Sequence, residues 1–358
     1  MSNQISRLKA IGTYGQQVWL DNLSRHLIES GHLARLIAED GVAGVTSNPA
    51  IFQQAFAKDP AYIAAKAALP ADMTDPEARF EALALSDIQA SCDIFRTVYD
   101  HSAGKQGYVS FEVSPHLAHD AAGTLAAAKR LWSKIDRPNV MIKIPATSAG
   151  LIAIRQATAS GINVNVTLVF SQSQVEAVAH AYIAGLQDRL AAGLPVSGIR
   201  SVSSVFISRV DAKLDPQLPE SLRGKVSIAS AKVAYAAWQR RWGPEGSEFA
   251  ALAAAGAMPQ ILLWASTGVK NPAYSDVLYI ESLIGPNTVN TIPEAPLEAF
   301  RDHGNAAATL ALDVASAQAV LDALPALKLD LNQIGEILQQ EGLAQFEQAF
   351  EKLVESAR

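Results

Sequence analysis

The sequence predicts a (β/α)8 barrel, the α/β fold in which parallel strands alternate with helices and close into a cylinder. Strand-like and helix-like segments alternate along the chain, and eight strand candidates precede the C-terminal helices. The 358 residues, 49% of them hydrophobic, are enough for the core of one large barrel. A doubly wound open sheet is the structural alternative, which periodicity alone does not exclude.

The expected strands are short apolar runs that end at or near polar residues. They cover residues 18–21, 42–47, 108–113, 140–147, 163–170, 201–208, 260–266 and 288–292. Helices are expected over residues 23–39 with a break at Gly31, over 49–99 with an interruption near 70–76, and over 118–134, 172–192 and 220–255. We treat residues 1–358 as a single barrel domain, in which residues from about 294 to 358 form a helical extension.

The charge and composition exclude several functional classes. A net charge of -6 argues against a nucleic-acid partner, because binding a phosphate backbone requires clustered positive charge. No uncharged apolar stretch approaches the ~20 residues of a membrane span, and the N-terminal residues do not resemble a signal peptide. The single cysteine, Cys92, suits a reducing compartment. We therefore expect a cytoplasmic protein that binds neither nucleic acid nor a membrane.

The sequence shows no signature of a cofactor or a metal site. It contains neither a glycine-rich dinucleotide fingerprint nor a phosphate loop. His116 and His119 lie close together, but a solvated helix start explains this pair better than a metal does. We expect neither a cofactor nor a metal.

The segment around Lys143 is the centre of the functional prediction. Val140, Ile142 and Ile144 share one face of the expected strand, and Lys143 lies on the other face. Lysine is rarely buried without a partner or a function. Burial disfavours the charged form of an amine, and a desolvated lysine attacks carbonyl groups to form Schiff bases. A lysine that extends from the strand end to water is the alternative.

The strands expected on either side of this lysine carry polar side chains on the inward face. Glu112 lies on the third strand, and Asn165 and Thr167 lie on the fifth. Barrel interiors are usually aliphatic, so this polar set indicates a pocket that forms hydrogen bonds. On the fifth strand, an apolar set is expected to face the helices: Val164, Val166, Leu168 and Phe170.

Further candidates follow other strands, at the rim where barrel enzymes place their active sites. Asp21 and Asn48 follow the first two strands, and each has the alternative role of a helix N-cap. Arg209 and Lys270 follow the sixth and seventh strands, where phosphate sites are often built. A surface salt bridge is the alternative for both cations.

Several of these segments together resemble the transaldolase family. The matching motifs are Thr46-Ser-Asn-Pro-Ala, Phe111-Glu-Val, Ile-Lys-Ile-Pro-Ala-Thr around Lys143, and Asn163-Val-Asn-Val-Thr-Leu-Val-Phe-Ser. They occur in the family's order and extend over most of the barrel. The region around Trp264-Ala-Ser-Thr-Gly-Val-Lys-Asn-Pro resembles the longer-chain subgroup, some members of which are fused to a phosphoglucose isomerase domain.

The resemblance implies a Schiff-base enzyme that moves a dihydroxyacetone unit between sugar phosphates. Sedoheptulose 7-phosphate and glyceraldehyde 3-phosphate would give erythrose 4-phosphate and fructose 6-phosphate, in the non-oxidative pentose phosphate pathway. Lys143 matches the Schiff-base lysine. Glu112 and Thr167 match the pair that positions a proton-shuttling water, and Asp21 matches the acid/base at the C4 hydroxyl.

The resemblance also implies a set of substrate-binding residues at the strand ends. They are Thr46, Asn48, Asn165, Ser204, Phe206, Arg209, Ser266 and Lys270. Asn48 and Asn165 would hold the dihydroxyacetone hydroxyls, whereas Ser204 and Arg209 fit a Ser-x-Phe-x-x-Arg pattern near the phosphate. Lys270 is the first cation after Ser266, where the family commonly has an arginine sooner. Lysine lacks the bidentate fork of arginine, so either Arg209 or Lys270 is a candidate for the phosphate clamp.

Three alternatives to a transaldolase remain open from the sequence. The first is a simple Schiff-base aldolase that releases free dihydroxyacetone, the second a pyridoxal phosphate enzyme using Lys143, and the third a non-catalytic barrel that binds sugar phosphates or a protein. The oligomeric state is also open. A homodimer is one hypothesis, with Tyr235, Trp238 and Trp242 as an aromatic face that forms either packed core or an interface.

Overall fold

The computed structural model describes residues 5–243 and 248–357 and shows a closed barrel of parallel strands, ordered β1 to β8 around the cylinder. The strands are β1 (Gln16–Leu20), β2 (Val42–Val45), β3 (Tyr108–Glu112), β4 (Val140–Pro145), β5 (Val164–Val169), β6 (Ser201–Phe206), β7 (Ile261–Ala265) and β8 (Thr288–Ile292). β8 pairs with β1, which closes the barrel. The predicted (β/α)8 fold is confirmed, and the open sheet is excluded.

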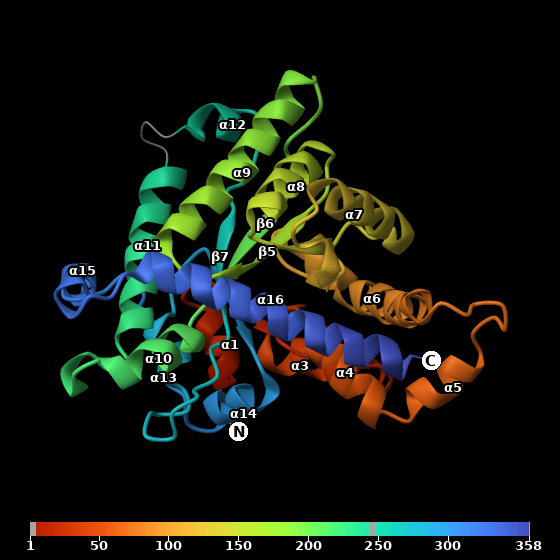
Figure 1. Cartoon of the computed structure of the whole chain (residues 1–358), viewed down its shortest axis with the longest axis horizontal. Helices are drawn as coiled ribbons and strands as arrows, with labels where there is room; N and C mark the ends of the chain where they lie inside the picture. Colours follow the sequence, from red (N-terminus) through yellow and green to blue (C-terminus); the bar gives the residue numbers. More distant parts are fainter. Residues whose placement is uncertain (1–4, 244–247, 358) are drawn as a thin grey trace.

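Helices surround the barrel and extend beyond it on one side (Figure 1). The first group is α1 (Arg7–Gly12), α2 (Arg25–Glu29), α3 (His32–Asp40), α4 (Pro49–Lys58), α5 (Ala61–Ala67), α6 (Pro76–His101), α7 (Ala121–Ile135) and α8 (Ser148–Ala159). The second group is α9 (Gln172–Ala191), α10 (Ser208–Leu214), α11 (Val226–Trp242), α12 (Ala250–Ala254), α13 (Leu278–Ser282), α14 (Glu294–His303), α15 (Val314–Asp322) and α16 (Leu331–Ser356). Gly31 separates α2 from α3 as predicted, with a φ of 70°. The helix expected over 220–255 is instead two helices, and residues 244–247 between them lie outside the described part.

The barrel interior is filled at its N-terminal end by large apolar side chains. Trp19 stacks on Tyr108 with ring centroids 6.4 Å apart, and Met141 and Val289 belong to the same buried cluster. Gly44 on β2 makes room for Trp19, because a Cβ at this glycine would lie 2.6 Å from the indole ring. These side chains form an apolar layer across the barrel. A cavity of about 290 Å³ lies on the N-terminal side of this layer and is lined by Trp19, Tyr108 and Met141 together with polar residues such as Gln16 and Arg200.

The apolar face predicted for β5 is wrong beyond Thr167. Val164 and Val166 belong to the large cluster between strands and helices as expected, but Leu168 belongs to the second cluster, and Val169 takes its place in the first. Leu168 has a φ of 59°, and the pairing of β5 with β6 shifts between Val166 and Val169. This bulge inserts one residue and reverses the alternation of side chains, which a strict period of two cannot anticipate.

The long helix α16 crosses the end of the barrel (Figure 1). Its Gln339 side chain donates hydrogen bonds of 3.0 Å to the carbonyls of Ala146 and Leu168, at the ends of β4 and β5. Two glycines let the helix approach this closely. A Cβ at Gly342 would lie 2.8 Å from Leu168, and one at Gly335 would lie 2.9 Å from Ser171. The C-terminal extension is therefore part of the wall around the strand ends.

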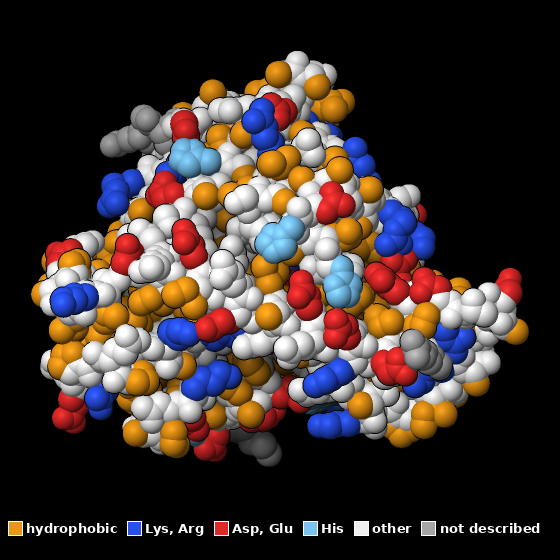
Figure 2. Space-filling view, in the orientation of Figure 1, with side chains coloured by type: hydrophobic (Ala, Val, Ile, Leu, Met, Phe, Trp, Pro, Cys, Tyr) orange, Lys and Arg blue, Asp and Glu red, His pale blue; other side chains and the backbone are white. Residues whose placement is uncertain are grey.

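Three features bear on possible partners: the described helices, the face of the surface in Figure 2 and the predicted aromatic face. None of the described helices is long and apolar enough to span a membrane. Basic and acidic side chains are interspersed on the face shown in Figure 2. Tyr235 stacks on Trp238, whose indole donates to Gln260, and Trp242 packs against Phe249. These aromatics are packed within the chain, and the homodimer stays a prediction.

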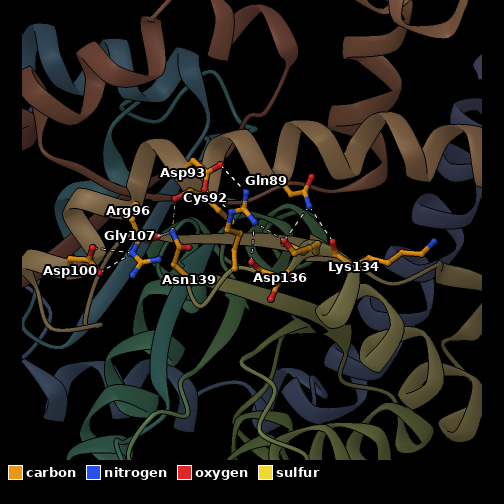
Figure 3. Close-up of polar contacts among 11 residues, drawn as sticks. Gln89, Cys92, Asp93, Arg96, Asp100, Gly107, Lys134, Asp136 and Asn139 are labelled. Atoms are coloured by element: carbon orange, nitrogen blue, oxygen red, sulfur yellow. Dashed lines mark hydrogen bonds and ion pairs between the residues drawn. The ribbon is translucent and has the colours of Figure 1, made fainter. Parts of the chain in front are cut away.

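The start of the lysine strand is attached to α6 by buried hydrogen bonds (Figure 3). Asn139, which precedes β4, donates to the carbonyl of Cys92 at 2.8 Å and to that of Gly107 at 2.9 Å. Closer to the surface, Gln89 donates to the carbonyls of Lys134 and Ile135 at the end of α7. Cys92 itself is fully buried in α6.

We predict that Asn139→Ala lowers the free energy of unfolding by about 2 kcal/mol, because it leaves two buried carbonyls without a donor. Urea denaturation measures this change. Gln89→Ala is the matched control: it also removes two hydrogen bonds to carbonyls, but near solvent, where water replaces them. Equal losses in the two variants would contradict the assigned role of the buried amide.

Candidate active site

A cavity of about 340 Å³ opens at the C-terminal ends of the strands. Its lining includes most of the predicted site residues: Asp21, Thr46, Asn48, Lys143, Thr167, Ser204, Phe206, Arg209, Ser266 and Lys270. The two predicted residues outside the lining, Glu112 and Asn165, contact Lys143 and Ser204 respectively. The structure therefore brings all of the predicted site residues together around one pocket.

Lys143 lies in the middle of β4 and is only 5% exposed. Its Nζ is 3.3 Å from the Glu112 carboxylate and donates a 3.1 Å hydrogen bond to the carbonyl of Ser47. In the barrel register, Lys143 pairs with Glu112 on β3 and with Asn165 on β5. The alternative of a lysine that extends to water is excluded, because its amine points into the barrel.

Asp21 follows β1, and its carboxylate is held in place by Thr46, which lies directly after β2. Thr46 donates a 2.8 Å hydrogen bond to its carboxylate and lies 2.6 Å from the Thr291 hydroxyl on β8. The N-cap of the following helix is Ser24, so the alternative role of Asp21 as that cap is wrong. Desolvation raises the pKa of Asp21, although Lys143 and the Thr46 hydrogen bond oppose the shift.

Glu112 also has a raised pKa. Burial is the main cause, opposed by the charge of Lys143, and the Asp21 carboxylate adds to the increase. The Thr167 hydroxyl is buried without a hydrogen-bond partner among the described residues. Glu112 Oε2 is buried too, and beyond its 3.3 Å ion pair with the Lys143 amine it accepts no hydrogen bond from the described residues. Such atoms require a partner, and a site between polar groups suits a water molecule or a substrate hydroxyl.

The two asparagines are oriented by the protein. Asn165 donates to the Ser110 hydroxyl at 2.9 Å and accepts from the Ser204 hydroxyl at 2.7 Å, which fixes the amide beside Lys143. Asn48 accepts the backbone N–H of Ile51 at 3.0 Å, so it is the predicted N-cap of α4. It also lines the cavity, and its NH2 group remains free to contact a ligand. The cap and the binding role are compatible.

The cations lie at the outer part of the cavity. Arg209 is half-buried, with its guanidinium 5.3 Å from the ring centroid of Phe206, and burial lowers its pKa. Lys270 is exposed in the loop after β7. Neither forms a hydrogen bond or ion pair within the described structure, so the salt-bridge alternative is wrong for both. Ser266 lines the same cavity, with a φ of 55° and its hydroxyl 3.0 Å from that of Ser208.

The sequence interpretation missed the contribution of α16 to this site. Phe346 lines the cavity, and its ring centroid is 5.7 Å from the amine of Lys143. The available signal was the spacing of Gly335, Gln339, Gly342 and Phe346, which places them on one helix face. Two glycines within one face of a long helix indicate a close approach to another segment.

The arrangement is suited to nucleophilic attack combined with proton transfer. A buried amine lies beside the Glu112 carboxyl group, and desolvation disfavours the ionised forms of both Glu112 and Asp21. Carboxyl groups with raised pKa values can donate protons near neutral pH. In the described ranges, no cluster of three or more His, Cys, Asp or Glu side chains could hold a metal.

Comparisons with known proteins agree with this geometry. Residues 18–357 match the family model for transaldolase/fructose-6-phosphate aldolase. The transaldolase of Neisseria gonorrhoeae is 51% identical over 350 residues, which are 98% of each chain. The transaldolase of Thiobacillus denitrificans is 48% identical over 97% of this chain and 98% of its own length. That of Mycolicibacterium smegmatis is 44% identical over 99% of this chain and 97% of its own.

We predict that Asp21→Asn stabilises the protein at neutral pH. The folded chain binds the Asp21 proton more tightly than the unfolded chain, so the wild type loses stability as pH rises above the usual Asp pKa of about 4. The variant avoids this loss, and its free energy of unfolding should exceed that of the wild type by about 0.5–2 kcal/mol at pH 7. Urea denaturation between pH 4 and pH 8 measures the difference.

Asp93→Asn is the control of opposite sign. Arg137 lowers the pKa of Asp93, so this variant should be less stable than the wild type by a constant amount above the usual Asp pKa of about 4, and the difference should shrink only as pH falls below it. A pH-independent difference for Asp21→Asn would contradict the raised pKa of Asp21.

Proposed function

We propose that the chain, which belongs to the transaldolase/fructose-6-phosphate aldolase family, is a transaldolase. It moves a dihydroxyacetone unit from sedoheptulose 7-phosphate to glyceraldehyde 3-phosphate, giving erythrose 4-phosphate and fructose 6-phosphate, in the non-oxidative pentose phosphate pathway. The observation that carries the proposal is the buried Lys143 amine, 3.3 Å from Glu112 at the base of a cavity lined with hydrogen-bonding groups.

The first step forms the Schiff base. The free amine of Lys143 attacks the C2 carbonyl of the ketose, and the C2 oxygen leaves as water after it receives a proton. Glu112 supplies this proton through a water molecule held with the Thr167 hydroxyl. Two groups on the strands flanking β4 support this assignment: the Glu112 carboxylate, which pairs with Lys143, and the Thr167 hydroxyl, which has no hydrogen-bond partner among the described residues.

The second step breaks the C3–C4 bond. Asp21 takes the proton of the C4 hydroxyl, the C4 fragment leaves as an aldehyde, and the protonated imine accepts the bonding electrons to become an enamine. The hydrogen bond from Thr46 orients the Asp21 carboxylate for this proton transfer. The enamine then attacks the incoming aldose phosphate, and the same steps run in reverse.

The dihydroxyacetone unit is held by Asn48 and Asn165. Asn165 is fixed between the hydroxyls of Ser110 and Ser204, so its remaining N–H and lone pair have a defined direction. This contact places the Ser204 hydroxyl at the lysine end of the pocket, where it positions Asn165.

The phosphate is bound by Arg209, with Ser266 and Lys270 lining the same cavity. Arg209 is half-buried, lacks an ion pair in the described structure and is positioned by the Phe206 ring. A desolvated guanidinium without a counter-ion is suited to a bidentate contact with phosphate. The more exposed Lys270 contributes a weaker, screened attraction.

We further propose that the enzyme acts in the cytoplasm on small sugar phosphates, without a cofactor. A buried thiol as the single cysteine is in keeping with that compartment. A homodimer remains a proposal, to be tested by light scattering.

Release of free dihydroxyacetone is the second candidate function, because the matching family model covers fructose-6-phosphate aldolases as well. Product analysis with and without an aldose phosphate acceptor separates the two.

We predict that fructose 6-phosphate and borohydride add one reduced dihydroxyacetone unit to the protein, located on Lys143 by peptide mapping. Lys143→Ala should form no adduct and lose activity by a factor of about 10³ or more. Lys270→Ala is the control, since it removes another lysine of the same cavity and should retain the adduct. An adduct on Lys143→Ala, or transfer by it, would refute the mechanism.

We predict that Arg209→Lys lowers kcat/KM for fructose 6-phosphate by roughly 10- to 100-fold, because it removes a charged bidentate contact. Donors without a phosphate should react at nearly unchanged rates. Lys270→Ala should have the smaller effect of the two and should depend more on salt. The assignment fails if Arg209→Lys reduces turnover of phosphorylated and unphosphorylated donors equally, or if Lys270→Ala is the more damaging change.

A further inference from the structure

The ring of Phe346 covers the amine of Lys143 from the side of α16. Its centroid lies 5.7 Å from Nζ, it lines the cavity, and it is only 6% exposed. We propose that Phe346 is a positioning residue that shields the lysine-bound dihydroxyacetone from water and thereby favours its transfer over its release. This inference rests on the proposed function and deepens it.

The position of the ring is set by one face of α16. Gly335, Gln339, Gly342 and Phe346 follow one another at spacings of four, three and four residues, so they face the barrel together. Gln339 binds the carbonyls of Ala146 and Leu168, at the ends of the strands that carry Lys143 and Thr167. Gly342 contacts Leu168 and lies near Arg209. These contacts hold the ring at a defined height above the amine.

The enamine on Lys143 has two fates. In transfer, its C3 carbon forms a bond to the aldehyde carbon of an aldose phosphate, and the aldehyde oxygen becomes a hydroxyl. In release, C3 takes a proton, water adds to C2, the C2–N bond breaks, and the lysine amine and free dihydroxyacetone are formed. Release consumes one water molecule, so any group that keeps water from C2 and C3 favours transfer.

An aromatic ring at this distance has two effects on the intermediate. Its apolar surface occupies space that water would otherwise fill next to the nitrogen. Its π face also attracts a cation within about 6 Å of the centroid, which includes the protonated imine formed on the same nitrogen. A ring held by α16 therefore stabilises the charged imine while leaving the opposite side of the cavity open to the aldehyde.

A second phenylalanine of the same helix provides a matched control. Phe350 lies one turn beyond Phe346 and is 5% exposed, but its ring packs on Phe80 and His116 at 5.8 and 5.6 Å. It does not line the cavity. Phe350→Leu thus makes a comparable change in the packing of α16 and leaves the Phe346 ring beside Lys143 unchanged. It therefore serves as the control for effects of packing alone.

The experiment measures the lifetime of the lysine adduct without an acceptor. The full-length protein is loaded with fructose 6-phosphate, the glyceraldehyde 3-phosphate that leaves is removed enzymatically, and borohydride is added after increasing delays to trap the adduct that remains. Phe346→Ala should shorten the adduct half-life by about tenfold, with a smaller effect for Phe346→Leu, which keeps apolar bulk but lacks the ring. Phe350→Leu should match the wild type. With an acceptor present, the ratio of released to transferred dihydroxyacetone should rise in the same order.

Each result bears on the inference. Equal adduct half-lives in the wild type, Phe346→Leu and Phe346→Ala would show that the ring only packs the helix, and would overturn the inference while leaving the Schiff base intact. If Phe346→Ala does not fold, Phe346→Leu alone decides by the same comparison. A wild type that forms no adduct would overturn the proposed function together with the inference. A wild type that forms an adduct but only releases dihydroxyacetone would overturn the transferase assignment, and the half-lives would still test the ring.

Discussion

The structure depends on holding one amine and two carboxyl groups together away from bulk water. Lys143 is 5% exposed, and both Glu112 and Asp21 have pKa values raised by burial even though a lysine lies nearby. Two buried carboxyl groups that face one amine are costly to ionise, and desolvation therefore favours the protonated form of each. The burial that costs stability thus favours an acid beside the nucleophile, which Schiff-base chemistry requires.

The barrel places this polar site above a layer of large apolar side chains. At the N-terminal end, Trp19, Tyr108 and Met141 fill the interior, and Gly44 makes room for the indole. At the C-terminal end, the inward positions carry Asn165 and Thr167 instead of aliphatic side chains. The same strands run through both ends of the barrel. Packing of large side chains between their N-terminal ends fixes the strand register, and this register places Glu112, Lys143 and Asn165 side by side at the C-terminal ends.

Much of the site was predictable because alternation along parallel strands is a local property. The inward face of Lys143, Glu112 and Asn165 follows from period-two patterns and from the order of strands. The reversal at Leu168 was not predictable, since a residue with side-chain bulk adopts positive φ there under tertiary constraint. The Ser204 contact with Asn165 and the position of α16 involve residues distant in sequence, which periodicity does not relate.

The contribution of α16 shows how a peripheral helix becomes part of the chemistry. Gln339 binds backbone carbonyls at the ends of β4 and β5, and hydrogen bonds to backbone constrain the strands regardless of which side chains they carry. The helix cannot shift without loosening the ends of the strands that hold Lys143 and Thr167. Packing of α16 against the barrel and alignment of Lys143 thus depend on each other. Residues of α16 complete a site whose first residue, Asp21, follows β1.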